Sequence, residues 1–348
     1  MDIKEFISTL GSSNILLITV ILILLVILIN GWTDAPNAIA TCVSTRSLTP
    51  KQAILMAAIF NFLGVLVMTI ISPKVLYTIS NMVDFGSNTN VALIALCAAM
   101  VAIVVWALFA WAFGIPTSES HALIAGISGA AIAINNGLEG INYKEWLKVI
   151  YGLIFSLLLG FILGFIVAKL IASIFAKSDR KKSQVFFQKG EVVASSMMAF
   201  MHGAQDGQKF MGVFLLSVSL SQGINNATTF QIPIWLMIFC SVVMALGTSI
   251  GGGRIIKKVG MNLIKLETYQ GFASDLTASF SLLLLSTFGI PVSTTHMKTS
   301  SIMGVGTAKR FSAVKWNVVK EMVLTWILTF PGCGMLGYFI AKLFITMF

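Results

Sequence analysis

The sequence predicts an all-α polytopic membrane protein built from two inverted-topology repeats, with broken helices and two re-entrant hairpins. Three observations predict it: long apolar segments, basic residues confined to a few loops, and polar motifs that occur twice. Of the 348 residues, 57% are hydrophobic and 10% are charged, against about 25% charged residues in a typical soluble domain. A soluble fold of this length could not hide that much apolar surface, so lipid must cover part of it.

The apolar segments are long enough to cross a bilayer, which takes about 20 helical residues. Ile15–Ile29 is apolar apart from Thr19, and Val91–Phe113 and Trp146–Phe175 are longer. The first segment lacks the basic flank and small-residue cleavage site of a signal peptide, so we expect it to remain as a span. The four cysteines stand at unrelated spacings in apolar segments, which supports neither a disulfide framework nor a zinc site.

The net charge of +10 indicates membrane topology rather than nucleic-acid binding. Most of the 23 Lys and Arg residues fall in four short loops, and the positive-inside rule places all four loops in the cytoplasm. These residues are Arg46, Lys51, Lys177, Arg180, Lys181, Lys182, Lys189, Arg254, Lys257, Lys258, Lys265, Lys309, Arg310, Lys315 and Lys320. No nucleic-acid partner is expected.

A basic stretch near the midpoint divides the chain into a first repeat (1–175), a cytoplasmic linker (176–191) and a second repeat (192–348). The motif "NGWTDAPN" from Asn30 aligns with "HGAQDGQK" from His202, at an offset of 172 residues. The motif "GIPTSESH" aligns with "GIPVSTTH" at an offset of 175, and "AKL" recurs at an offset of 173. Matches in the same order at nearly constant offset predict two copies of one unit.

The basic loops also fix the direction of each half. The first half is expected to run inward to Arg46, outward to Pro73, inward along Val91–Phe113, outward through a broken segment at 116–136, and inward along Trp146–Phe175. Because five is an odd number, the second half must run upside down relative to the first, as in many secondary transporters. We therefore expect a cell-membrane protein with both termini outside.

The first repeated motif places polar side chains on one face of a helix at membrane depth. Its positions are Asn30, Thr33, Asp34, Asn37 and Thr41 in the first half and His202, Gln205, Asp206 and Lys209 in the second. A carboxylate at this depth is costly unless paired or solvated, and oxygen ligands suit a hard cation such as Na⁺. The alternative is that both Asp residues only tie helices together. Their matching positions in the two halves favour a functional site.

The second repeated motif is a cluster of hydroxyl side chains directly after Gly-Ile-Pro. Pro followed by Ser and Thr is typical of a helix N-terminus, which binds anions through free N–H groups and its dipole. The hydroxyl residues are Thr117, Ser118 and Ser120 in the first half and Ser293, Thr294 and Thr295 in the second. Simple helix capping is the alternative, and the paired arrangement favours an anion site where two helix ends meet.

Four further residues have two interpretations each. His121 and His296 stand at paired positions and either titrate or donate to an anion, or are hydrogen-bonded packing residues. Lys209 replaces the Asn of the first half and either neutralises substrate charge or pairs with an Asp. The internal pair is favoured, because buried charges usually have protein partners. Glu119 is either a cation ligand or the partner of a basic group.

Asp275 and Arg254 lie near the cytoplasmic side of the second half. They are a possible gating pair, although an ordinary solvated loop charge is the more common role for a residue such as Arg254.

The motifs "NGWTDAPNAIATCVSTRSLTP" and "MHGAQDGQKFMGVF" resemble the paired signature of the inorganic phosphate transporter (PiT) family. "GIPTSESHALIAG" and "GIPVSTTHMKTSSIMGVG" resemble the paired hairpin motifs of that family, and the likeness covers nearly the whole chain. The resemblance implies a cation-coupled symporter of inorganic phosphate with two re-entrant hairpins, commonly a homodimer. The family commonly has Asn before the signature Asp, where this chain has Thr33 and Gln205. This difference, and Lys209 at the position matching Asn37, leave the coupling ion open.

We therefore expect import of inorganic phosphate by alternating access, in symport with Na⁺ rather than H⁺, without a resident cofactor. The expected phosphate ligands are Ser118, Ser120, Ser293, Thr294, Thr295, Asn37 and Lys209. The expected Na⁺ ligands are Asp34, Asp206, Thr33, Asn30, Gln205 and Glu119, and His121, His296 and Asp275 are candidates for gating or proton linkage. Of these, the resemblance implies that Asp34, Asn37 and Asp206 coordinate cations or phosphate and that the five hydroxyl residues line the phosphate.

Three rival functions differ in chemistry. A transporter of another tetrahedral oxyanion such as sulfate is the nearest, although sulfate carries no proton for a carboxylate acceptor. An intramembrane hydrolase with Ser118 or Ser120 as nucleophile and His121 as base lacks the G-x-S-x-G elbow, and neighbours on one helix turn do not face each other. We expect no enzyme activity. A channel would show passive, uncoupled flux.

Overall fold

The computed structural model describes residues 2–113, 117–223 and 232–348, and it is helical throughout them apart from turns and one isolated bridge between Val83 and Ile141. The Gly114-Ile115-Pro116 turn lies outside the described residues. The α-helices are α1 (Ile3–Ser12), α2 (Asn14–Thr33), α3 (Pro36–Ser44), α4 (Pro50–Ile71), α5 (Lys74–Ser80), α6 (Thr89–Ala112), α7 (Glu119–Asn135), α8 (Tyr143–Ile174), α9 (Arg180–His202), α10 (Gln208–Ser221), α11 (Ile234–Ile250), α12 (Gly253–Ile256), α13 (Thr268–Thr287), α14 (Thr294–Lys309) and α15 (Trp316–Met347). Short 3₁₀ and π turns are η1 (Leu138–Gly140), η2 (Gly203–Gly207), η4 (Lys257–Asn262) and η5 (Phe311–Ala313).

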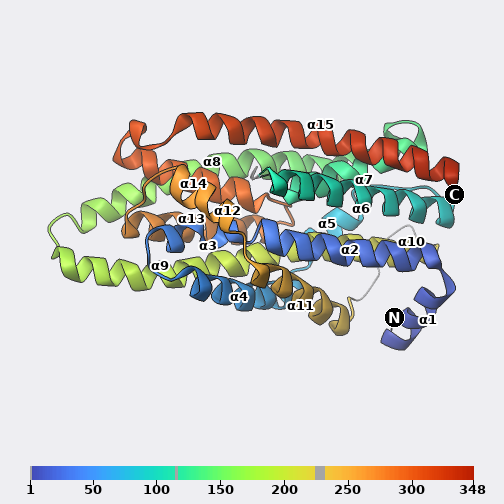
Figure 1. The fold of residues 1–348 in the computed structure, drawn as a ribbon, viewed down its shortest axis with the longest axis horizontal. Helices are drawn as coiled ribbons and strands as arrows, with labels where there is room; N and C mark the ends of the chain where they lie inside the picture. The colour runs from blue at the N-terminus through green and yellow to red at the C-terminus, as the bar shows by residue number, and fades with distance from the viewer. Residues whose placement is uncertain (1, 114–116, 224–231) are drawn as a thin grey trace.

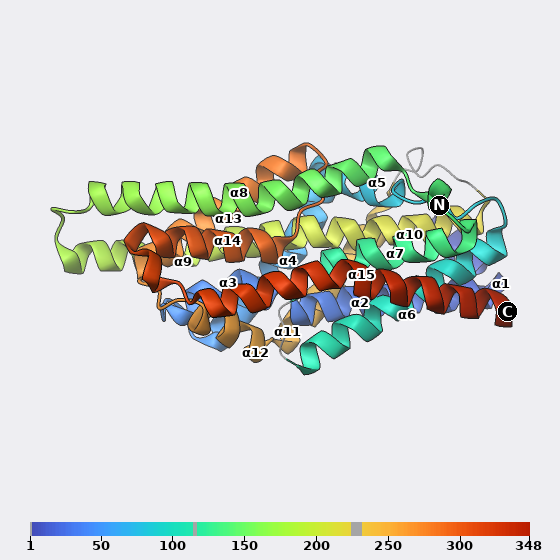
Figure 2. The same ribbon diagram turned by 90° about the horizontal axis from the view of Figure 1, so that it is seen from above.

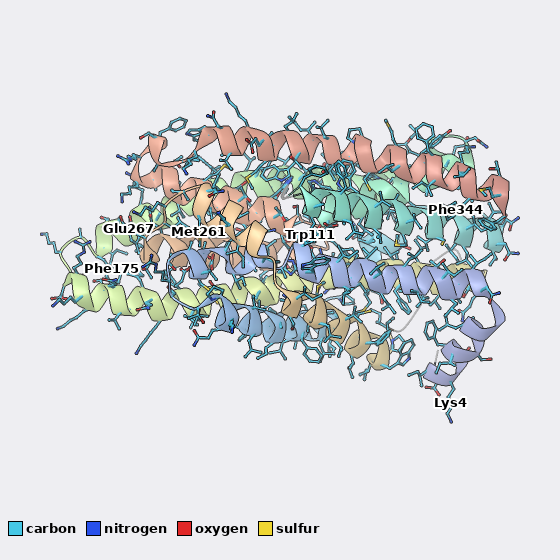
Figure 3. The ribbon with its side chains drawn as sticks, viewed as in Figure 1. Lys4, Trp111, Phe175, Met261, Glu267 and Phe344 are labelled. Carbon is cyan, nitrogen blue, oxygen red and sulfur yellow. The ribbon has the colours of Figure 1, made fainter. Side chains whose placement is uncertain are left out.

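Most helices run along one long axis, and both chain termini lie at the same end, which we call the terminal end (Figures 1 and 2). The opposite end carries the loops around Arg46, Arg180 and Lys315, and we call it the basic end. Figure 3 shows Phe175 and Glu267 toward the basic end and Lys4 and Phe344 toward the terminal end. The basic loops thus gather on one side of the molecule, as the positive-inside argument requires.

Five helical stretches are long and apolar enough to cross a membrane. They are Asn14–Ser44, Pro50–Ile71, Thr89–Ala112, Tyr143–Ile174 and Trp316–Met347. On α8 and α15, large apolar side chains such as Ile162, Leu158, Leu324 and Ile327 are exposed, which is the surface that lipid covers. The predicted all-α, multi-pass membrane protein is therefore confirmed.

The path of α6 differs from the predicted crossing along Val91–Phe113. Trp111, near the end of α6, packs on Trp32 at the end of α2, with ring centroids 4.4 Å apart. The end of α7 then returns to the start of α6, since Asn135 donates to the Asp84 carbonyl at 2.8 Å. Figure 2 shows α6 ending near the middle of the molecule. Residues 89–135 therefore form an antiparallel pair that enters and leaves from the terminal end.

Protein covers more of α6 than of α8, and hydropathy alone does not distinguish such a helix from a lipid-covered span. The apolar window of α6 is 67% buried inside the molecule, whereas the window of α8 is 28% buried. Both helices have the length and composition of a span. The first half therefore contains three long single segments, α2–α3, α4 and α8, and the antiparallel pair α6–α7. The pair begins and ends at the same end of the molecule, so only the three single segments count as passages.

The second half contains a similar pair at the other end. The end of α14 returns to the start of α13, where Lys309 pairs with Glu267. The turn between them passes through Gly289, whose φ of +70° lies in the left-handed region that glycine adopts without strain. The α13–α14 pair therefore opens from the basic end, opposite to α6–α7 (Figure 1).

Each pair packs its second helix against a long helix from the other half, in matching register. A Cβ on Gly129 of α7 would lie 2.1 Å from the Gly334 carbonyl oxygen of α15. A Cβ on Gly304 of α14 would lie 2.1 Å from the Phe161 carbonyl oxygen of α8. Gly129 and Gly304 are 175 positions apart, and Phe161 and Gly334 are 173 apart. These are the same offsets that relate the repeated motifs.

Candidate functional site

Two helix interruptions position the paired carboxylates, Asp34 and Asp206, that the sequence singles out. Asp34 caps the end of α2, and α3 begins two residues later at Pro36, whose missing N–H suits a first helical turn. Asp206 lies within the π turn η2 between α9 and α10, and such turns recur at functional sites. Both carboxylates therefore stand where the regular helical hydrogen bonds are broken.

Glycine allows neighbouring helices to approach closely at both interruptions. A Cβ on Gly31 would lie 2.4 Å from the Met244 carbonyl oxygen, and one on Gly203 would lie 2.3 Å from the Asn61 carbonyl oxygen. Contacts that short require the backbone to move. Gly31 and Gly203 therefore permit the close approach of neighbouring backbone.

The Asp34 carboxylate is 2% exposed and is held by neutral donors. Thr295 donates a short hydrogen bond to its Oδ1, and the Asn37 amide donates to the same oxygen at 2.6 Å. The Asn37 amide also reaches Thr295 Oγ1 at 3.1 Å. A residue of the second hydroxyl cluster thus joins the first carboxylate.

The Asp206 carboxylate is fully buried and is held by one cationic donor, Lys209, together with neutral groups. Lys209 Nζ lies 2.7 Å and Ser120 Oγ 3.2 Å from its Oδ1. Thr294 Oγ1 lies 3.1 Å and His202 Nε2 3.3 Å from Oδ2, with the Asn30 amide at 3.5 Å. A residue of the first hydroxyl cluster thus joins the second carboxylate.

The two hydroxyl clusters meet at the ends of α7 and α14. Ser118 caps α7 by accepting from the His121 N–H at 3.3 Å, and Ser293 caps α14 by accepting from the His296 N–H at 3.2 Å. Ser293 Oγ lies 2.8 Å from Ser118 Oγ. Because helix N-termini carry a partial positive charge, their convergence favours an anion at this point.

The paired histidines also meet. The rings of His121 and His296 are 4.3 Å apart in an edge-to-face contact. Phe330 packs 4.5 Å from His121, and Trp326 packs 3.9 Å from His296. Both histidines are buried, and α15 supplies both aromatic neighbours.

Several oxygen atoms near the first carboxylate fit a cation. Within the described residues, Asn30 Oδ1, Asp34 Oδ2 and Asn37 Oδ1 are buried and receive no hydrogen bond. Buried acceptors normally have a donor or a cation as partner. Ligand atoms of Asp34, His202 and Asp206 all lie within 4.8 Å of one another. This donor set fits a small cation, with carboxylate and amide oxygens as its hard ligands.

Glu119 and Gln205 have different surroundings from Asp34. Thr33 Oγ1 lies 3.3 Å from Glu119 Oε1, so the Glu119 carboxylate reaches the first-half side of the site. The Gln205 amide donates to Ser286 Oγ at 2.8 Å and accepts from the Val292 N–H at 3.2 Å. Both polar ends of Gln205 are thus engaged with the turn that precedes α14.

Asp275, on α13, contacts Thr41 of α3, one helical turn beyond Asn37, rather than lying beside Asp34. Thr41 donates to both of its carboxylate oxygens at 2.9 and 2.8 Å, and Ser195 donates a short hydrogen bond. Its charge partner is Lys298, a residue that the sequence analysis did not single out. The side chain of Arg254 is not among the described residues, so the predicted Asp275–Arg254 pair lies outside what the structure covers.

Lys298 and Glu191 are the two buried charged residues that sequence reasoning missed. Lys298 is fully buried and also donates to Thr41 Oγ1 at 2.9 Å. Glu191 is fully buried on α9, where its carboxylate packs over Gly271, and neither of its oxygens receives a hydrogen bond within the described residues. A charged residue at membrane depth is a candidate functional residue. The lysine in "HMKTS", which follows an apolar segment, could therefore have identified Lys298 from the sequence.

A cavity of about 980 Å³ opens at the basic end. Its lining includes Arg46, Arg180 and Lys265, together with Ser44 and Thr45 at the end of α3. Figure 3 labels three further lining residues, Phe175, Met261 and Glu267, on this side of the molecule. Along α3, the Asp275–Lys298 pair at Thr41 thus lies between the central carboxylates and this cavity.

Comparison with known proteins identifies the family of the chain. The sequence profile of the phosphate transporter family matches residues 30–337. The chain belongs to the phosphate transporter family. The matched range contains both halves of the site described above, so the predicted family resemblance is confirmed.

Curated relatives carry names of the same family. A probable low-affinity inorganic phosphate transporter of Bacillus subtilis is 39% identical over 337 residues, covering 95% of this chain and 99% of the relative. A protein of the same name from Rhizobium meliloti is 35% identical and covers 90% of this chain and 93% of its own length. The solved structure titled "The sodium-dependent phosphate transporter" has the same fold, with a TM-score of 0.87 at 23% identity, and covers 97% of this chain and 100% of its own. The family and these relatives are transporters, which agrees with the expectation that the chain is not an enzyme.

Proposed function

We propose that this chain imports inorganic phosphate by symport with a cation, Na⁺ rather than H⁺, through alternating access about the buried central site. One observation carries the proposal: each carboxylate is bonded to a hydroxyl of the opposite half. Thr295 donates to Asp34 and Ser120 donates to Asp206. Because the cation site and the phosphate site share side chains, a bound cation can raise the affinity for phosphate, and bound phosphate can raise the affinity for the cation.

Phosphate would bind where Ser118 and Ser293 now bond to each other, at the N-termini of α7 and α14. Ser120, Thr294 and Thr295 would add neutral donors, and Asn37 and Lys209 stand beside them. The phosphate names of the curated relatives support this substrate. Carboxylates near the site, such as Glu119, can accept the proton of HPO₄²⁻, which sulfate lacks.

Na⁺ would bind at Asp34, with Asn30, Thr33 and Glu119 as neighbouring ligands. Asp206, whose carboxylate lies within 4.8 Å of that of Asp34, would face this cation from the second half. Gln205 would support the site through its bonds to Ser286 and Val292. The oxygens of Asn30, Asp34 and Asn37 without hydrogen-bond donors support a hard cation there. A protein titled as sodium-dependent has the same fold, and we carry its ion to this chain as part of the proposal.

The matching registers of α7–α15 and α8–α14 support an inverted repeat, with α6–α7 and α13–α14 as the two re-entrant hairpins. The proposed repeats are residues 1–175 and 192–348, joined by the linker 176–191. Rocking of such halves exposes a fixed site to each side in turn. We propose a cell-membrane homodimer with both termini outside, in which Asp275 gates the cytoplasmic route and His121 and His296 lie at the contact between hairpins.

The test is phosphate uptake into liposomes that contain the purified protein, with Asp34→Asn and Asp206→Asn compared with the wild type. We expect both variants to lose cation-dependent uptake, while the exposed control Asp84→Asn keeps it. Sulfate in excess should not compete. Wild-type uptake with unchanged cation dependence in both variants would contradict the proposal, and strong sulfate competition would point to a general oxyanion carrier.

A further inference from the structure

We propose that Lys209 is a tethered cation that permanently fills the second of two related cation positions, so that each transport cycle carries one cation fewer than it would with a neutral residue at 209. The inference deepens the proposed symport and rests on it. It starts from the contacts of the Lys209 ammonium, which has three N–H donors.

All three Lys209 donors have protein acceptors. Nζ lies 2.7 Å from Asp206 Oδ1, 2.6 Å from Ser120 Oγ and 2.5 Å from the Val292 carbonyl oxygen. The side chain is fully buried. A carboxylate, a hydroxyl and a main-chain carbonyl are also the oxygen ligands that a hard metal cation takes. The ammonium is therefore surrounded as a bound cation would be, and no donor is left for phosphate in this arrangement.

The equivalent place in the first half is held by a neutral side chain. Asn37 aligns with Lys209, and its amide makes the equivalent contacts to Asp34 Oδ1 at 2.6 Å and Thr295 Oγ1 at 3.1 Å. Asn37 supplies no positive charge to Asp34. Two oxygens of this half, Asp34 Oδ2 and Asn37 Oδ1, are buried acceptors that receive no hydrogen bond within the described residues, whereas Asp206 has donors at both of its oxygens. The first half therefore needs an added cation, whereas the second half carries its own.

Neighbouring charges agree with this difference between the halves. The Lys209 ammonium lies 2.7 Å from Asp206 Oδ1, whereas His202 Nε2, 3.3 Å from Asp206 Oδ2, makes no hydrogen bond within the described residues. On the other side, Glu119 approaches Thr33 and adds a second carboxylate. A carboxylate without a cationic partner is costly at membrane depth, so the transported cation is directed to the first half.

The test compares the cation-to-phosphate ratio of the wild type with those of Lys209→Asn and Asn37→Lys. The ratio is calculated from the membrane voltage at which net phosphate flux into liposomes is zero. This voltage is measured first under a fixed Na⁺ gradient and then under a fixed pH gradient. We expect Lys209→Asn to raise the ratio by one and Asn37→Lys to lower it by one. Lys144→Asn, an exposed lysine far from the site, should leave it unchanged.

A Lys209→Asn variant that transports phosphate at the wild-type ratio would overturn the proposal. If that variant does not transport, the effect of Na⁺ on its melting temperature tests the proposal instead. A Na⁺ ion that takes the place of the Lys209 ammonium can bind there only in Lys209→Asn, and bound Na⁺ stabilises the folded protein. Added Na⁺ should then raise the melting temperature of Lys209→Asn by more than that of the wild type, and equal shifts would overturn the proposal. If no cation gradient drives wild-type uptake, the proposed symport itself has failed, which is a different result.

Discussion

Ser118 and Ser293, 175 residues apart in the chain, share a hydrogen bond of 2.8 Å between their side-chain oxygens. Each also caps the short helix that follows it. If the two halves are the inverted repeats proposed above, this contact lies near the symmetry axis between them. The contact therefore places the two helix N-termini, and their hydroxyls, at one point in the buried centre.

Removing either of these hydroxyls should weaken phosphate binding without abolishing transport. We expect Ser118→Ala and Ser293→Ala each to raise the KM for phosphate about tenfold, since a hydrogen bond to a charged group contributes ~1.5–3 kcal/mol. The double variant should show less than the sum of the two effects, because the residues contact each other. Initial uptake rates at saturating Na⁺ give the KM.

A buried serine outside the site serves as the control for these variants. Ser219 on α10 bonds only to a carbonyl of its own helix at 2.9 Å, and Ser219→Ala should keep the wild-type KM. Unchanged KM values in both Ser118→Ala and Ser293→Ala would remove the helix ends from the phosphate site.

The Lys298–Asp275 ion pair should be sensitive to loss of one partner and tolerant of loss of both. Lys298→Met leaves a buried carboxylate unpaired, which costs ~3–5 kcal/mol of stability. Replacing both partners, as Lys298→Met with Asp275→Leu, should recover most of the lost stability. Thermal unfolding in detergent measures the difference.

Transport by the double variant tests the gating role of the pair. Because Asp275 stands between the central site and the cavity at the basic end, we expect a folded double variant to transport slowly. Wild-type uptake in that variant would show that the pair is only structural.

Two glycine contacts should be equally intolerant of a side chain. Gly129→Ala and Gly304→Ala each bring a Cβ to 2.1 Å from a backbone oxygen of the neighbouring long helix. Overpacking of this kind costs ~1–3 kcal/mol or more. Gly11→Ala is the control, because a Cβ there meets nothing within 4 Å. A large loss at only one of the two contacts would argue against equivalent packing in the two halves.

The parts of the site that occur twice can be located from the sequence. Asp34 and Asp206, and Ser118 and Ser293, are recognisable because each pair recurs at nearly the same offset. Lys298 has no such counterpart: the residue 175 positions earlier is Leu123. The Asp275–Lys298–Ser195 cluster therefore left no repeat signal, although the structure brings it together from three helices.

Hydropathy also misjudged α6, for a physical reason. An apolar helix covered by protein has the same composition as one covered by lipid, so length and apolarity alone predicted a crossing for Val91–Phe113. The contact of Trp111 with Trp32 shows where the chain turns back.

The orientation of the chain can be tested by labelling single cysteines introduced at the two ends. Lys4→Cys and Lys144→Cys lie toward the terminal end, and Ser178→Cys and Lys315→Cys lie toward the basic end. With a membrane-impermeant thiol reagent added to intact cells, we expect the first two to react and the last two to react only after permeabilisation. The four native cysteines are buried, so the background should be low.

Reaction of Lys4→Cys and Ser178→Cys from the same side would contradict the topology. Reaction of Ser178→Cys but not Lys4→Cys in intact cells would invert it and place the basic loops outside.

The central claim is that a cation gradient drives phosphate through this site, and accumulation against a gradient tests it most directly. Liposomes containing the wild-type protein would receive equal phosphate on both sides, an inward Na⁺ gradient and no pH gradient. The account predicts net phosphate accumulation that collapses when the Na⁺ gradient is removed and is absent in Asp34→Asn. Equilibration without accumulation under both an imposed Na⁺ gradient and an imposed pH gradient would contradict it.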